Sequence, residues 1–166
     1  MKKVSFLLFA VLIGFLSACG PTAEEAAKYN DKIVAEQSEI VQKTDALIET
    51  YTTFINEDIQ SAYDNAVSQV DASLKVVNEM EDFNKSGVFK GEAVELFNSY
   101  KSILEVEHKE MVRLYALPDT AFTQEHSLNW DKLSEDADAK TQAAIEKFKL
   151  AQEKFAKENN LELTVE

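Results

Sequence analysis

The four residues EVEH at positions 105–108 contain half of a known metal-binding pattern, Glu-x-x-His. Glu105 and His108 are three residues apart, so a helix would bring their side chains to one face. Di-iron sites in four-helix bundles combine two such pairs with two further glutamates. The chain's other histidine, His126, follows Thr123 at this spacing instead of a glutamate. The sequence therefore predicts no metal site, with Glu105 and His108 as the only candidate ligands, and we expect His108 at the edge of the core beside a hydrogen-bond partner.

Other catalytic and cofactor chemistries lack their residues as well. The chain has no Cys-x-x-Cys-His haem motif, and Met111 shares a predicted helix with His108, so these two side chains cannot bind opposite faces of a haem iron. No nucleophile elbow, phosphate-binding glycine loop or zinc-ligand spacing is present. With 30 acidic residues in the chain, no single carboxylate pair stands out. We therefore predict that the protein is not an enzyme and holds no cofactor.

The larger aromatic side chains are the remaining candidates for a binding role. They are Tyr29, Tyr51, Tyr63, Tyr100, Tyr115 and Trp130. Most of them fall in the apolar stripes of predicted helices, where such rings fill a core and their hydroxyl groups reach the surface. We expect core packing for most of these rings, and a ligand cavity between helices is the alternative.

The N-terminus has the pattern of an export signal. Lys2 and Lys3 precede residues 4–16, thirteen residues that are apolar except for Ser5 and Gly14. A membrane-spanning helix needs about 20 apolar residues, so this run is short for a permanent anchor. We expect residues 1–18 to be a cleaved signal peptide.

The only cysteine of the chain follows this run directly. The sequence LSAC at positions 16–19 resembles the lipobox of bacterial lipoprotein signal peptides. The resemblance implies that the Cys19 thiol receives a diacylglyceryl group and that the peptide bond before Cys19 is cut. Two or more acyl chains hold a domain stably on a membrane. We therefore expect a lipid anchor on Cys19 in the bacterial cell envelope, on the outer membrane, with the periplasmic and the surface-exposed face both open.

The charge of the chain limits its partners. Loss of residues 1–18 removes two of the 17 basic residues and none of the 30 acidic ones, which changes the formal charge from −13 to −15. Phosphate binding needs clustered lysine and arginine side chains, and the sequence has no such cluster. We predict no nucleic-acid partner. The expected partners are the membrane, through the lipid on Cys19, and a protein or extracellular ligand of unknown identity.

The rest of the sequence predicts helices. Thr22 and Glu25 form a capping-box pattern, so a tether over residues 19–22 leads into a first helix from Ala23. Its apolar stripe recurs every seven residues and includes Ile33, Ile40, Leu47 and Phe54. The stripe changes phase at residues 56–58, which predicts a break and a second, antiparallel helix up to Phe83. The alternative, one helix over residues 23–83, would be about 90 Å long and too long for this domain to cover.

Two further helices complete the predicted domain. Residues 84–91 form a polar loop with Phe89 turned back onto the bundle, and a third helix follows up to Leu117, before Pro118. Residues 119–127 form a second connection, and the fourth helix runs from about Leu128 to Asn159. The sequence predicts an all-α fold, an antiparallel up-down-up-down four-helix bundle over residues 23–160, and a tail over residues 161–166 with Leu161 packed on the bundle.

Three stretches resemble a family of uncharacterised helical bacterial surface lipoproteins: AKYNDKIVAEQ at 27–37, FKGEA with LFNSY over 89–100, and AQEKFAK at 151–157. The resemblance implies an envelope location and supplies no catalytic residue. The sequence thus favours a lipid-anchored envelope or surface protein that acts as a binding or structural interaction module. The alternative is a periplasmic bundle that binds a small ligand or metal around Glu105, His108 and the neighbouring aromatic side chains.

Overall fold

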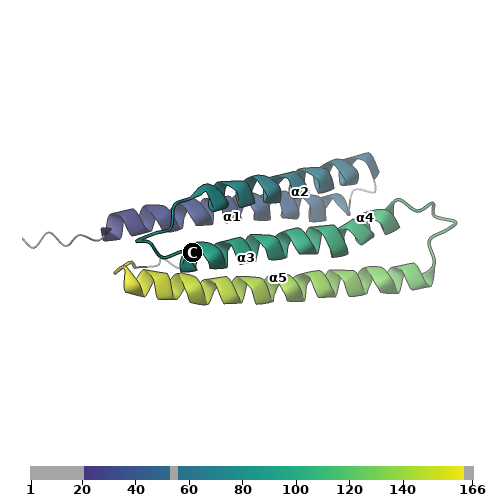
Figure 1. Cartoon of the computed structure of the whole chain (residues 1–166). Coiled ribbons are helices and arrows are strands. Elements are labelled where there is room, and N and C mark those ends of the chain that lie inside the picture. Colours follow the sequence, from purple (N-terminus) through teal and green to yellow (C-terminus); the bar gives the residue numbers. More distant parts are fainter. Residues whose placement is uncertain (1–20, 53–55, 163–166) are drawn as a thin grey trace, which may run out of the picture.

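The protein folds into four helical rods, and a π-helical turn interrupts the third of them. The computed structural model describes residues 21–52 and 56–162. It contains α1 (Ala23–Thr50), α2 (Asn56–Glu79), α3 (Val88–Ile103), the π-helical turn η1 (Leu104–His108), α4 (Lys109–Tyr115) and α5 (Gln124–Glu158). These elements form four rods, the third made of α3, η1 and α4. Figure 1 shows the rods side by side. The predicted all-α four-helix bundle is confirmed.

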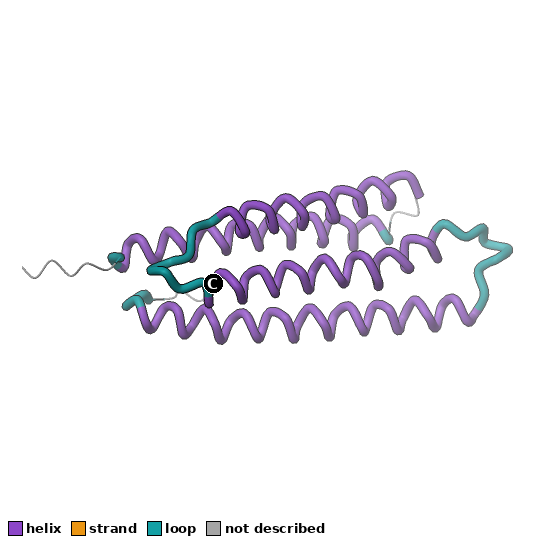
Figure 2. The backbone as a smooth tube through the Cα atoms, viewed as in Figure 1, coloured by secondary structure: helices purple, strands orange, loops and turns teal. Residues whose placement is uncertain are grey.

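The described ranges contain no strand (Figure 2), and the only strand-like pairing in them is an isolated bridge between Phe83 and Ser86. Within the same ranges, no helix combines the length and the apolar character that a membrane crossing needs.

The start of α1 follows the predicted capping box. The Thr22 side-chain oxygen accepts a hydrogen bond from the Glu25 amide at 3.2 Å, and the Glu25 carboxylate accepts one from the Thr22 amide at 2.7 Å. These bonds satisfy two backbone donors that would otherwise have no partner at the helix end. The bond from the Thr22 amide is also the main reason that the pKa of Glu25 lies below its ordinary value.

The predicted break between the first two helices is confirmed. α1 ends at Thr50 and α2 begins at Asn56. The hydroxyl groups of Thr50 and Thr52 donate to the carbonyl oxygens of Leu47 and Glu49 in the last turn of α1. Phe54, which the sequence assigns to the apolar stripe, lies outside the described residues.

The predicted loop over residues 84–91 is too long at its second end, because α3 already begins at Val88. The turn itself is made by Asn84 and Lys85, whose φ angles are 51° and 62°. Phe89 lies in the first turn of α3 and stacks on Phe155 with ring centroids 4.3 Å apart. This contact stabilises helix in a stretch whose glycines favour a loop, and it confirms that Phe89 packs on the bundle.

The predicted start of the last helix at Leu128 is also wrong, because α5 begins at Gln124. Thr123 caps it: its side chain accepts from the His126 amide at 3.3 Å, and His126 Nδ1 accepts from the Thr123 amide at 3.2 Å. Histidine here takes the role that glutamate or glutamine usually has in a capping box.

The four rods close around one core. Main-chain packing joins α1 to α2, α2 to α3 and α3 to α5. Side chains close the remaining side, where the Gln152 amide donates to Asn30 at 2.9 Å and the rings of Tyr29 and Phe155 lie 6.0 Å apart. At the end of α5, the Leu161 amide donates to the Ala156 carbonyl and the Leu161 side chain packs against the core, as predicted.

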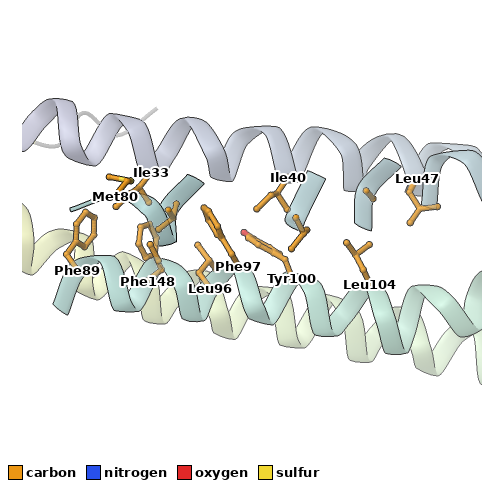
Figure 3. Close-up of a cluster of buried hydrophobic side chains, with 14 of the residues drawn as sticks. Ile33, Ile40, Leu47, Met80, Phe89, Leu96, Phe97, Tyr100, Leu104 and Phe148 are labelled. Carbon is orange, nitrogen blue, oxygen red and sulfur yellow. The ribbon is translucent and has the colours of Figure 1, made fainter. Parts of the chain in front are cut away.

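The predicted apolar stripe of α1 forms one wall of this core. Ile33, Ile40 and Leu47 are at most 1% exposed. Figure 3 shows the three side chains directed from α1 toward the third rod, where the labelled residues include Phe97 and Leu104. Seven residues make nearly two helical turns, so this spacing keeps all three on one face.

We predict that Ile40→Ala lowers the free energy of unfolding by ~2–5 kcal/mol, because it removes a fully buried side chain and leaves a cavity. Chemical denaturation monitored by circular dichroism measures this change. The matched control is Ile48→Ala on the same helix, where 46% of the residue is already exposed and the expected loss is below ~1 kcal/mol. Equal losses for the two variants would contradict the assignment of the core face.

Candidate functional site

The π-helical turn η1 brings two polar residues into the core. A π-helical turn holds more residues than an α-helical turn. Such turns are rare in proteins, and those that occur are often found at functional sites. Within η1 the adjacent residues Glu107 and His108 are 3% and 5% exposed, together with Leu104 at 1%. Val106 stays 54% exposed. The turn therefore places a carboxylate and an imidazole inside an apolar bundle, where each needs a partner.

The partner of Glu107 comes from α5. Lys140 Nζ lies 2.6 Å from Glu107 Oε1, and this bond is the main cause that raises the pKa of Lys140. The Lys140 side chain is 56% exposed, so the pair joins a buried carboxylate to an ammonium group in contact with water. Glu107 Oε2 is buried and has no hydrogen-bond partner among the described residues. The attraction of Lys140 offsets part of the cost of burying the carboxylate.

The partner of His108 comes from the end of α1. The Tyr51 hydroxyl oxygen lies 3.0 Å from His108 Nδ1, and the two rings stack with centroids 6.1 Å apart and an angle of 13°. Burial lowers the pKa of His108, although the nearby carboxylates of Glu107 and Asp138 act in the opposite direction. Burial also raises the pKa of Tyr51. His108 thus lies deeper than the predicted edge of the core, and it has a hydrogen-bond partner, as predicted.

The structure does not bring Glu105 and His108 together. The Glu105 side chain is 51% exposed and pairs with Lys101 at 3.8 Å, on the outer side of the rod. His126 lies at the start of α5, with its ring 5.8 Å from that of Phe122. In residues 21–52 and 56–162, no group of three or more His, Cys, Asp or Glu side chains is arranged to hold a metal ion.

A pocket with a volume of about 780 Å³ opens at the end of the bundle where α4 connects to α5; we name it the distal pocket. Its lining includes four aromatic side chains, those of Tyr51, Tyr115, Phe122 and Trp130. Trp130 meets Tyr51 edge to face, with ring centroids 5.0 Å apart at 83°, and lies 6.1 Å from Tyr115 at 52°.

The rest of the lining is formed by Leu114, Leu117, Asp119 and Ser127. Tyr51 belongs both to this wall and to the contact with His108, so it connects the buried polar pair to the pocket.

The aromatic residues singled out in the sequence divide between the two expected roles. Tyr51, Tyr115 and Trp130 line the distal pocket, which is the ligand-cavity alternative. Tyr29 packs in the core between Phe83 and Phe155, and its hydroxyl donates to the Glu81 carbonyl. Two residues, Phe122 and Glu107, carry no signal in the sequence that predicts their places. Phe122 lies in a loop outside any periodic stripe, and glutamate is usually exposed.

Comparisons of the chain with protein-family models, with curated proteins and with solved structures find no match.

We predict that Lys140→Ala lowers the free energy of unfolding in the wild-type background, because it leaves the buried Glu107 carboxylate without its cation. In a Glu107→Gln background the same change has a smaller effect, since a neutral amide needs no counter-charge. A double-mutant cycle from denaturant unfolding measures the difference. A coupling energy of zero would show that the two side chains do not stabilise each other.

We predict that His108 makes the stability of the protein depend on pH. Burial holds the pKa of His108 in the folded chain below its ordinary value of 6.5. At a pH between the folded and the unfolded pKa, the unfolded chain therefore binds a proton that the folded chain does not. The free energy of unfolding therefore falls as the pH drops from about 7 through the unfolded pKa toward the lower folded value.

We expect His108→Gln to remove this part of the change of unfolding free energy with pH. Denaturant unfolding curves at a series of pH values between 5 and 7.5 measure it. The matched control is His126→Gln, because glutamine at that position keeps the capping box of α5. If His126→Gln flattens the profile as much as His108→Gln does, the buried histidine is not the source.

Proposed function

We propose that the protein is a lipoprotein of the bacterial envelope, anchored through Cys19, whose helical bundle is a binding module. The observation that carries this proposal is the sequence of the N-terminus: a charged start, a thirteen-residue apolar run and the stretch LSAC with the only cysteine. Thr22, which caps α1, is the third residue after Cys19. The anchor and the folded domain are thus separated by a short tether.

An anchor at Cys19 leaves the distal pocket on the far side of the domain from the membrane. The N-terminus of α1 and the connection between α4 and α5 lie at opposite ends of the bundle (Figure 1). The 28 residues of α1 span about 40 Å at 1.5 Å per residue. The pocket would then face the compartment into which the domain projects, which suits the capture of a ligand from that compartment.

The chemistry of the distal pocket favours binding over catalysis. Concave pockets lined by aromatic and aliphatic side chains with a few polar groups are typical of ligand sites. The buried carboxylate of Glu107 and the buried imidazole of His108 are engaged by Lys140 and Tyr51 and do not line the pocket. The pocket also favours the small-ligand form of the alternative function over its metal-binding form, because aromatic rings and leucines are poor ligands for metal ions.

We predict that wild-type protein expressed in a Gram-negative host fractionates with the membranes, whereas Cys19→Ala appears in the soluble fraction or as uncleaved precursor. Acyl chains supply the membrane affinity, and the variant has no thiol to receive them. Cell fractionation with immunoblotting and intact-mass measurement of the purified protein follow both forms. The matched control is Ser17→Ala, which keeps a small residue before the cysteine and should remain in the membrane. A processed Cys19→Ala chain that stays wholly in the membrane would contradict the lipid anchor.

A further inference from the structure

The distal pocket has aromatic walls from four separate parts of the chain. Tyr51 follows the end of α1, Tyr115 ends α4, Phe122 lies in the connection, and Trp130 lies in the second turn of α5. The rings of Tyr51 and Trp130 are nearly perpendicular, and that of Tyr115 is inclined by 52° to Trp130. The face of an aromatic ring attracts a cation, and several inclined rings can surround one cation from different sides.

The charge of the pocket points to the same kind of ligand. Among the described residues that line it, Asp119 is the only charged side chain, so no lysine or arginine competes for the site. Arg113, two residues before Tyr115, is engaged by two hydrogen bonds to Glu110, at 2.7 and 2.6 Å. The chain as a whole carries a formal charge of −13, which attracts cations and repels anions.

The Tyr51 side chain is held in place before any ligand arrives. The Tyr51 hydroxyl is fixed by His108, which η1 buries in the core, and the Tyr51 ring stacks on His108 and meets Trp130 edge to face. Side chains that are already ordered lose less conformational freedom on binding, which favours affinity for a small ligand.

We propose that the distal pocket binds a small organic ammonium cation, with the charged group among the faces of Tyr51, Tyr115 and Trp130 and near the Asp119 carboxylate. The pocket volume of about 780 Å³ lies within the range of small-molecule sites, roughly 300–1,000 Å³. This inference rests on the proposal that the bundle is a binding module, but it does not depend on the lipid anchor.

Trp130 offers a direct probe, because it is the only tryptophan in the 166 residues. The full chain, purified in a non-ionic detergent, is titrated with choline and separately with 3,3-dimethylbutan-1-ol, which has the same shape and no charge. We expect a saturable change of Trp130 fluorescence with choline and an affinity about two-fold to thirty-fold higher than for the alcohol, the range of a cation–aromatic interaction. No saturable response to choline, or equal affinity for the two compounds, would overturn the proposal.

Two variants test the role of the carboxylate. Asp119→Asn lies in an exposed connection and should weaken choline binding about two-fold to five-fold, the size of an exposed ion pair. Asp31→Asn removes the same charge from an exposed position near the other end of α1 and should leave the affinity unchanged. Equal weakening by both variants would overturn the assignment of Asp119, because the effect would then come from the overall charge.

The cation site and the lipid anchor are tested by separate experiments. Fractionation of the Cys19→Ala variant tests the anchor without involving the pocket, and choline titration tests the pocket without involving the lipid.

Discussion

The bundle depends on the mutual burial of one apolar stripe from each rod, because a chain with a single cysteine has no internal disulfide to hold it. Ile33, Ile40 and Leu47 repeat every seven residues and keep one face of α1 against the other rods. Aromatic rings close the two ends of this core. Phe89 and Phe155 stack at the end near the start of α1, and Tyr51 meets Trp130 at the other end. The helices thus leave an aromatic surface at the end farthest from the predicted anchor.

The two polar residues that η1 buries have partners in other rods. Glu107 is paired with Lys140 of α5, and His108 is paired with Tyr51 at the end of α1. One π-helical turn therefore joins the third rod to α5 beside it and to the end of α1 across the core. Since an unpaired polar group in such a place costs free energy, these contacts favour one arrangement of the rods over alternatives with the same apolar pattern. The same contacts orient Tyr51, so the geometry of the distal pocket is coupled to the core.

The features that depend on neighbours in sequence could be predicted, and those that depend on distant residues could not. The capping box of Thr22 and Glu25 and the phase change near residue 56 are local patterns, and both are found in the structure. The start of α3 is not predicted correctly, because Gly87 and Gly91 favour a loop and the stabilising contact of Phe89 is with Phe155, far along the chain. The burial of Glu107 depends in the same way on Lys140, 33 residues later. The distal pocket combines four segments that only the fold brings together.

The extra residue of η1 has a consequence for the evolution of this rod. A π-helical turn corresponds to one residue inserted into an α-helix, and each residue of an α-helix turns the chain by about 100°. The insertion therefore sets the rotational phase of α4 independently of α3, and it decides which side chains of α4 face inward. Deletion of one residue from η1 would restore a regular helix and turn Leu114 and Tyr115 by about 100° around the rod axis. A single-codon change could thus rebuild one wall of the distal pocket while the packing of α3 stays as it is.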